Sequence, residues 1–277
     1  MPMDKLSSQR WELLLSLTKR DLKVRYKESV LGFLWSFIRP ALLTLVMWLV
    51  FGVLIPMQPP GATAPFWMHV LISVLCWNFF LGTLMEATGS VVTNANLLKK
   101  VRLDAEVFPI SVILSNAIHL VLGLGIALLL IPLVTDGFSW RILFLPVVLG
   151  IEVLLILGFS LWLSAWNVFY RDVGSALELM GMVAFYLSPV VYPISLVVER
   201  LQEVSNPDGW FTVYLTNPMT AILAGVRRST IYGGSFTELP DRLLGGLLFA
   251  VAVVSAIFTL WSWRRFRRLS TRFADEF

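Results

Sequence analysis

Six stretches of this chain are apolar over about twenty residues each, and they constrain its fold more than any other feature. An apolar helix of about twenty residues crosses the roughly 30 Å hydrocarbon core of a membrane. Hydrophobic residues make up 57% of the 277 residues and charged residues only 14%, against about 45–50% and 25% in soluble domains. The sequence therefore predicts an all-α integral membrane protein with six transmembrane helices, at residues 33–55, 66–89, 108–132, 142–166, 174–192 and 243–263.

The basic residues predict how these helices are oriented. Cytoplasmic segments of membrane proteins are enriched in Lys and Arg. With both termini inside, the inner segments hold most of these residues, among them Lys19, Lys23, Lys27, Lys99, Lys100, Arg102, Arg171, Arg264, Arg265, Arg267, Arg268 and Arg272. Arg200, Arg227, Arg228 and Arg242 fall in the last outer segment and weaken the bias without reversing it. We therefore expect both termini to be cytoplasmic, with residues 264–277 as a cytoplasmic tail.

Residues 5–28, within a cytoplasmic segment 1–32, predict an amphipathic helix that lies on the membrane surface rather than crossing it. When successive residues are placed 100° apart around a helix axis, the helix has one polar face and one apolar face. The polar face holds Glu12, Ser16, Lys19, Lys23 and Lys27, and the apolar face holds Trp11, Leu14, Leu15, Leu22 and Tyr26. Such a helix anchors the chain to anionic lipid, takes part in docking a partner, or does both.

The inner loop between the second and third spans predicts a short cytoplasmic helix. Thr93, Asn94 and Asn96 are candidate helix caps, and Leu97, Leu98 and Val101 follow helical spacing. The alternative is a solvated basic loop that only follows the charge bias of cytoplasmic segments.

The outer segment at 193–240 is too apolar for an ordinary loop. Residues 195–203 are long enough for two helical turns, and the Asn-Pro-Asp-Gly sequence at 206–209 is a strong turn signal. Neither this helix nor the one that follows is long enough to span. The segment therefore predicts two short re-entrant helices that dip into the outer leaflet. An ordinary extracellular cap is the alternative.

The second of these short helices has clear ends. Asn217 is a candidate N-cap with Pro218 at the first helical position, and the helix can run to Ile231. Much of it is apolar, while Arg227 and Arg228 are expected to hold its far end at the polar surface.

Three polar residues are expected at membrane depth, namely Glu86, His119 and Glu152. Charge in lipid is costly, so such residues face protein or water. Glu152 is protonated, paired with His119, or joined to another helix by one hydrogen bond, and a packing role is favoured over a proton relay. Glu86 could instead reach the cytoplasmic boundary.

The sequence predicts neither catalytic residues nor a metal site. An enzyme groups its carboxylates, histidines or metal ligands at one site. Here the only two histidines, His69 and His119, lie on different spans, and Cys76 is the only cysteine. The chain also lacks a Gly-x-x-x-x-Gly-Lys-Ser/Thr loop that would cradle nucleotide phosphates.

Five motifs occur in order along the chain. They are residues 17–27 (LTKRDLKVRYK) followed by Leu31-Gly32, Trp35 and Pro40, then Phe108-Pro109, Tyr170-Arg171-Asp172, residues 188–193 (SPVVYP) and Asn217-Pro218. Together with six spans, this set resembles the permease subunits of ABC exporters of cell-surface polysaccharides such as O-antigen, capsule, teichoic acid or galactan. The resemblance covers essentially the whole chain.

The resemblance implies a single permease domain at 1–277 that forms a homodimer in the bacterial cytoplasmic (inner) membrane. It implies two copies of a separate ATPase subunit, which binds ATP and Mg, and no cofactor in this chain. The substrate would be a lipid-linked polysaccharide, and no nucleic-acid partner is expected. A membrane-embedded transferase or hydrolase acting on lipid-linked sugars is the alternative.

The resemblance also implies roles for particular residues. The ATPase-coupling helix would contain Asn96, Leu97, Leu98, Lys99, Lys100, Val101 and Arg102, with Arg171 and Asp172 as a second cytoplasmic contact. An outer gate would contain Pro189, Tyr192, Pro193, Leu196, Val197, Asn217 and Pro218.

A path for a glycan needs flat apolar platforms, because the C–H faces of sugars pack on aromatic rings. Candidates at suitable depth are Trp48, Phe51, Trp77, Phe79, Phe80, Phe185 and Tyr186. Each of them is also accounted for as a lipid-facing or interfacial aromatic residue.

Overall fold

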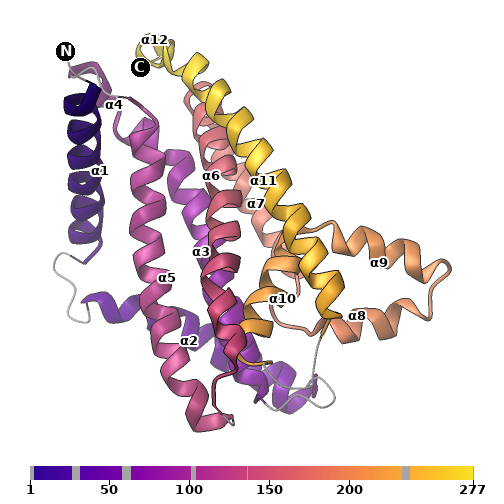
Figure 1. Ribbon diagram of the computed structural model, residues 1–277. Helices are drawn as coiled ribbons and strands as arrows, with labels where there is room; N and C mark the ends of the chain where they lie inside the picture. The colour runs from indigo at the N-terminus through magenta and orange to yellow at the C-terminus, as the bar shows by residue number, and fades with distance from the viewer. Residues whose placement is uncertain are drawn as a thin grey trace.

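The computed structural model describes residues 3–26, 32–57, 64–100, 104–135, 137–232 and 238–276, and these residues form helices and turns without any β-strand. Figure 1 shows long helices side by side, with the two termini at one end of the molecule. The long helices are α2 (Trp35–Trp48), α3 (Phe66–Thr93), α5 (Val107–Val134), α6 (Leu145–Phe169), α7 (Asp172–Leu187) and α11 (Asp241–Ser270). The other elements are α1 (Met3–Tyr26), η1 (Gly32–Leu34), the π-helical η2 (Leu49–Leu54), α4 (Ala95–Lys100), η3 (Trp140–Phe144), α8 (Ile194–Leu201), α9 (Pro207–Leu215), α10 (Pro218–Thr230) and α12 (Phe273–Glu276).

Five helical segments are long and apolar enough to cross a membrane, so the prediction of an all-α membrane protein is confirmed. They are Trp35–Leu54, Phe66–Lys99, Val107–Val134, Trp140–Phe169 and Asp241–Ser270. The sixth predicted span coincides with α7, which has 16 residues. At 1.5 Å per residue it is about 24 Å long, so the count of six crossings stays a prediction.

Helix α7 ends earlier than the predicted span at 174–192 because of Pro189. A residue before proline is pushed out of the α region, and Ser188 accordingly has the extended angles φ −103° and ψ 147°. The chain then turns through residues 188–193 into α8.

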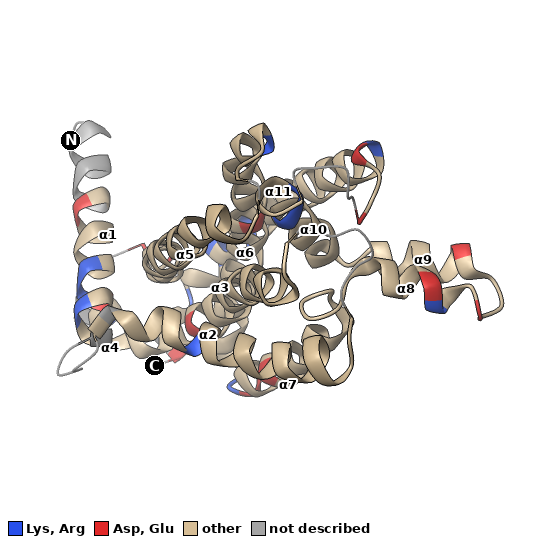
Figure 2. Cartoon of the chain, turned by 90° about the horizontal axis from the view of Figure 1, so that it is seen from below, with Lys and Arg blue, Asp and Glu red and all other residues tan. Residues whose placement is uncertain are grey.

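Helix α3 is the centre of the molecule. Figure 2, a view along the bundle, shows it surrounded by α2, α5, α6, α7 and α10. Most of its side chains are buried, and one hydrophobic core joins it to its neighbours through residues such as Ile72, Leu124, Ile156 and Ile222.

Helix α1 packs against the beginning of α5 at the same end of the molecule as α4. Leu17 is buried beside Val107 and Phe108, with Leu13 and Leu14 also in contact with this cluster. The packed face thus shares only Leu14 with the predicted apolar face, while Trp11 and Leu15 stay 58% and 38% exposed. The predicted lipid contact rests on those exposed residues and stays a prediction.

The outer segment contains three helices, so the prediction of two was wrong. The missed helix is α9, because Asn206-Pro207 is its N-cap and first residue rather than an isolated turn. Asn206 has the left-handed angles φ 63° and ψ 59°, and its side-chain oxygen accepts a hydrogen bond from the Gly209 N–H. Figure 1 shows α8 and α9 as a hairpin that projects sideways from the bundle.

Helix α10 is a core element rather than a surface helix. Asn217 caps it by accepting a hydrogen bond from the Met219 N–H, as predicted. Every residue from Met219 to Thr230 is buried, against α3, α6, α11 and η3. The expectation that Arg227 and Arg228 lie at the polar surface was therefore wrong.

Helices α6 and α11 approach closely at Gly158. A Cβ atom there would lie 2.8 Å from Cδ1 of Phe258, 2.9 Å from Oγ1 of Thr259 and 3.3 Å from the Thr259 backbone nitrogen. Small residues allow such close approach of helices in membranes.

Replacing Gly158 with Leu is expected to destabilise the protein by about 1–3 kcal/mol, because overpacking forces the two helices apart. The matched control is Gly150→Leu on the same helix, where a Cβ would meet nothing within 4 Å. The midpoint of thermal unfolding of the purified protein in detergent measures the difference. Equal midpoints for the two variants would contradict the proposed contact.

Candidate functional site

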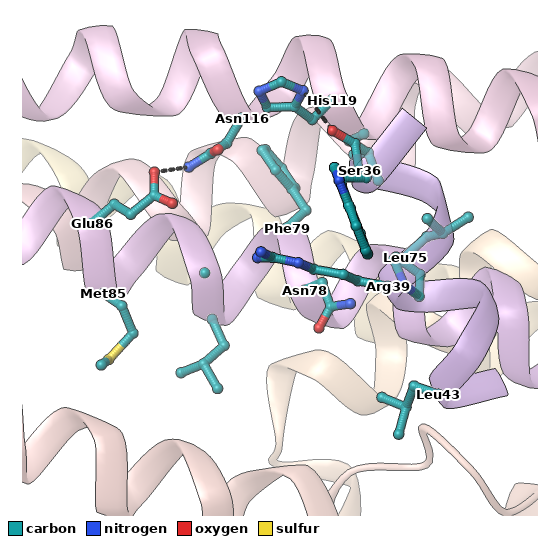
Figure 3. Close-up of a pocket in the computed structure, with 15 residues that line it drawn as sticks. Ser36, Arg39, Leu43, Leu75, Asn78, Phe79, Met85, Glu86, Asn116 and His119 are labelled. Carbon is teal, nitrogen blue, oxygen red and sulfur yellow. Dashed lines mark hydrogen bonds between the residues drawn. The ribbon is translucent and has the colours of Figure 1, made fainter. Parts of the chain in front are cut away.

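A groove of about 750 Å³ lies between α2, α3 and α5 (Figure 3). Helix α2 contributes Trp35, Ser36, Arg39, Pro40 and Leu43, α3 contributes Leu75, Asn78, Phe79, Leu81, Gly82, Met85 and Glu86, and α5 contributes Asn116, His119 and Leu120. The groove therefore brings together two of the three polar residues predicted at membrane depth, Glu86 and His119.

The polar side chains of the groove are connected across the helices. The Asn116 amide donates to Oε2 of Glu86 at 2.9 Å, which joins α5 to α3. Ser36 Oγ lies 3.3 Å from Nδ1 of His119, which joins α2 to α5. Figure 3 shows both pairs in the upper part of the view, with Arg39 and Asn78 below them.

Asn78 and Glu86 are exposed in the groove, although most of α3 is buried. Asn78 lies near the middle of α3, and His119 lies near the middle of α5. Polar side chains at this depth are costly against lipid and face protein or water. The polar lining of the groove therefore favours protein or water over lipid as its neighbour.

Glu152, the third predicted polar residue, lies apart from the groove in the buried face of α6. It is fully buried, and neither of its carboxyl oxygens has a hydrogen-bond partner in the part of the chain that the structure describes. The suggested pairing with His119 and the favoured hydrogen bond to another helix are therefore both wrong, because neither carboxyl oxygen has a partner among the described residues.

The aromatic residues that were predicted to line the substrate path lie in separate parts of the structure. Trp77, Phe80, Phe185 and Tyr186 form a chain of ring contacts that joins α3 to α7, with centroid distances of 5.3–5.7 Å. Trp77 is only 3% exposed, whereas Tyr186 is 69% exposed. Trp48 and Phe51 are half-buried near the end of α2. Only Phe79 lines the groove.

A buried ion pair connects the outer segment to the core. Arg227 is fully buried, and its guanidinium donates to Oε2 of Glu238 at 2.6 and 2.9 Å. It also donates to Ser73 Oγ at 3.0 Å and to the Pro189 carbonyl at 2.7 Å. One side chain thus joins α10, α3, the turn after α7 and the segment before α11.

His69 and Tyr232 extend this network. Nδ1 of His69 lies 2.8 Å from the Tyr232 hydroxyl and 3.9 Å from Oε1 of Glu238. Burial raises the pKa of Tyr232 above its ordinary value of 10.0, so the hydroxyl keeps its proton. The neighbouring Arg228 donates to the Tyr232 carbonyl and to Asp241.

Sequence reasoning missed the Arg227 network. The available signal was two arginines inside an otherwise apolar helix, followed by acidic residues at 238 and 241. A charged side chain in an apolar segment is expected to form an ion pair with a side chain of opposite charge.

The predicted gate residues surround this network. Pro189 is buried and accepts from Arg227, and the Tyr192 hydroxyl donates to the Tyr186 carbonyl at 3.1 Å. The Asn217 amide donates to Ser188 Oγ at 2.9 Å. Further along, Pro193 precedes α8, where Leu196 and Val197 are half-buried, and Pro218 begins α10.

At the opposite end, α4 presents only part of its predicted coupling surface. Leu97 and Leu98 pack on the cluster formed by Leu17, Val107 and Phe108, whereas Asn96 and Lys99 are exposed. Arg171, before α7, and Asp172, the first residue of α7, are exposed as well. Val101 and Arg102 lie outside the described residues, and Lys100 is placed only as the last residue of α4.

No group of three or more His, Cys, Asp or Glu side chains that could hold a metal ion occurs among the described residues.

The long apolar helices and the short helices of the outer segment are those of a multi-pass membrane protein. Residues 12–232 match the model of the ABC-2 type transporter family. The chain is 32% identical over 252 residues to the O-antigen export system permease protein RfbA of Myxococcus xanthus, covering 90% of this chain and 89% of that protein. It is 26% identical over 267 residues to a protein of the same name from Klebsiella pneumoniae, covering 96% and 95%. The chain belongs to the ABC-2 type transporter family, which makes it a transporter rather than a transferase or hydrolase.

Replacing Arg227 with Met is expected to destabilise the protein by about 3–5 kcal/mol, because the Glu238 carboxylate stays buried without its partner. Adding Glu238→Leu should recover most of that loss. The control Asp241→Asn acts on a carboxylate whose side chain is 56% exposed, and it should cost at most about 1 kcal/mol. Thermal unfolding in detergent measures all four proteins, and equal losses for Arg227→Met and Asp241→Asn would refute the assignment.

Proposed function

We propose that this chain is the channel-forming permease subunit of an ATP-driven exporter that moves a lipid-linked cell-surface polysaccharide out of the cytoplasm. The observation that carries the proposal is the match to O-antigen export permeases over nearly the full length of both proteins, together with the family match over residues 12–232. A full-length match supports the same architecture and the same kind of cargo.

The energy comes from a separate ATPase subunit. The chain has no phosphate-binding Gly-x-x-x-x-Gly-Lys-Ser/Thr loop, so ATP and Mg are bound by that partner and this chain needs no cofactor. The surface at the α4 end is where we place the contact, because Asn96, Lys99, Arg171 and Asp172 are exposed there.

We place this end in the cytoplasm and the α8–α9 hairpin outside, in the bacterial inner membrane. Figure 1 shows α4 and both ends of the described chain at one end of the bundle, which agrees with the Lys and Arg bias of the sequence. Residues 188–193 and 217–218 would then form the base of an outer gate, with α8 and α9 as its outward part.

A second copy of the chain completes the path. The groove exposes Asn78 and Glu86 at membrane depth, which excludes lipid as its preferred neighbour. Helix α2, beside the groove, is the least buried of the five spanning segments. A symmetric pair of chains, each contributing α2 and its groove, would enclose an aqueous path between them.

The proposal is tested by reconstituting the chain into vesicles with the ATPase encoded beside its gene and measuring delivery of the lipid-linked glycan across the membrane. We expect delivery that depends on ATP hydrolysis and that stops when the ATPase is omitted. A complex that hydrolyses ATP but delivers no glycan, with every candidate ATPase tried, would exclude the proposal.

The exposed positions of α4 allow a specific test of its contact with the ATPase subunit. Lys99→Glu and Asn96→Trp alter exposed positions of α4, so they should weaken ATPase association about tenfold without changing the stability of the permease. Leu97→Asp is the contrasting variant, because Leu97 packs on the α1–α5 contact and should lower the thermal midpoint of the permease itself. Co-purification with the ATPase measures association. Unchanged association for both exposed variants would remove α4 from the interface.

A further inference from the structure

We infer that α6 and α11 form a binding site for one anionic phospholipid of the surrounding membrane, at the end of the bundle that carries both termini (Figure 1). In this site Arg265 binds the lipid phosphate, and the rings of Trp162, Trp166 and Trp261 line the space beside it. The inference goes beyond the proposed function, because it concerns a lipid of the bilayer and not the exported cargo.

A small pocket of about 120 Å³ lies between these two helices. Whole small-molecule sites usually measure about 300–1,000 Å³, so this pocket can hold only one end of a larger ligand. The rest of that ligand has to lie along the outer surface of α6 and α11. The lining residues are mainly aromatic, basic and small, namely Trp162, Ala165 and Trp166 from α6 and Trp261, Ser262, Arg265, Phe266 and Leu269 from α11.

The pocket lies where α11 changes from apolar to charged sequence. Residues 243–263 contain no charged side chain, and Arg264, Arg265, Arg267 and Arg268 follow directly. Such a change marks the level of the lipid head groups, where Trp rings and the long side chains of Arg are both favoured. A ligand in this pocket therefore has its polar end at head-group level.

The arginines at this level carry positive charge that the described residues leave uncompensated. Arg267 pairs with Glu106 at 3.6 Å. The other three share an exposed face of α11 with Trp261, because positions 261, 264, 265 and 268 fall within about 100° around the helix axis. No carboxylate among the described residues is paired with any of these three arginines. This face of the helix therefore attracts an anion.

Two hydrogen-bond donors of the pocket have no acceptor in the part of the chain that the structure describes. Arg265 is exposed, and its guanidinium carbon lies 5.8 Å from the centroid of the Trp261 ring. Ser262 is fully buried, and its hydroxyl has no hydrogen-bond partner, which is rare for a buried polar group. A phosphate offers several acceptor oxygens, which a guanidinium binds in a bidentate manner. The pocket thus favours a phosphate over a neutral head group.

An aromatic surface continues from the pocket toward the middle of the membrane. The Phe258 ring contacts Trp162 and Trp261 at centroid distances of 6.2 and 5.8 Å, and it contacts Phe159, about one turn deeper on α6, at 4.9 Å. Ile257, beside Phe258, is 64% exposed. Acyl chains pack on such a surface, and a soluble anion has none to offer. The occupant is therefore a phospholipid, whose phosphate and acyl chains meet both parts of the site.

Native mass spectrometry of the full-length chain, transferred from dodecyl maltoside micelles, tests the site. The probes are dioleoyl phosphatidylglycerol, which is anionic, and dioleoyl phosphatidylcholine, which has the same acyl chains and no net charge. We expect the chain to retain one phosphatidylglycerol at an approximately fivefold lower lipid concentration than phosphatidylcholine. Arg265→Gln should abolish that preference. The matched control Arg272→Gln removes the same charge from an exposed position beyond the end of α11, and it should keep the preference.

Trp166→Ala tests the aromatic rings separately from the charge. Trp166 lines the pocket and is 39% exposed, so its removal should weaken retention of both lipids about threefold and leave their ratio unchanged. Trp140→Ala is the control, because Trp140 is 66% exposed at the other end of the bundle. The thermal midpoints of Arg265→Gln and Trp166→Ala in lipid-free detergent should match that of the unmodified chain, since both side chains are exposed.

Several results would overturn the inference. Equal retention of the two lipids by the unmodified chain would exclude a preference for anionic lipid, and equal losses in Arg265→Gln and Arg272→Gln would reduce it to net charge. Displacement of phosphatidylglycerol by millimolar inorganic phosphate would leave only a phosphate site, and displacement by an equal amount of a polyprenyl phosphate would assign the pocket to a lipid carrier. Weaker co-purification of Arg265→Gln with the ATPase, at unchanged lipid retention, would assign the pocket to that subunit.

Discussion

A polar side chain in the middle of a membrane needs a hydrogen-bond or ion-pair partner from protein or water. The packing of the helices in this protein meets that requirement in two different ways. In the outer half, Arg227 and Glu238 satisfy each other inside the core, at 2.6 Å and with 0% and 3% of their side chains exposed. In the groove, Asn78 and Glu86 are left exposed on a helix that is otherwise buried. The Arg227–Glu238 pair is satisfied within the core, whereas the exposed side chains of the groove favour protein or water over lipid as neighbours.

The Arg227 network anchors α10 and the turn at residues 188–193, from which α8 and α9 project. Helix α10 is buried along its whole length, and Arg227 ties it to Ser73 and to the Pro189 carbonyl. Helices α8 and α9 mostly contact each other and project from the bundle (Figure 1). The outer gate proposed above would therefore have α10 and the turn at residues 188–193 as its anchored base, on which α8 and α9 pack through Ile194 and Tyr214.

Much of the architecture was predictable because it depends on local signals. Each predicted span coincides with a helix, within a few residues at most ends, since the length of an apolar run sets the length of the helix. The Asn217 cap and the Pro218 start of α10 were also correct, because capping involves only the next few residues. The sequence at 206–209 was interpreted as an isolated turn, but it begins α9. The same residues are typical of a turn and of the start of a helix, and only the residues that follow distinguish the two.

Sequence alone thus determined the class of protein, the positions of its helices and its resemblance to polysaccharide export permeases, all of which follow from hydropathy, charge bias and short motifs. The tertiary structure decided which side chains meet. Arg227 and Ser73 are 154 residues apart, Ser36 and His119 are 83 apart, and Leu97 faces α1 rather than solvent. Contacts of this kind depend on the rotation and spacing of packed helices, and the period of a single helix carries no information about the face that its neighbour will meet.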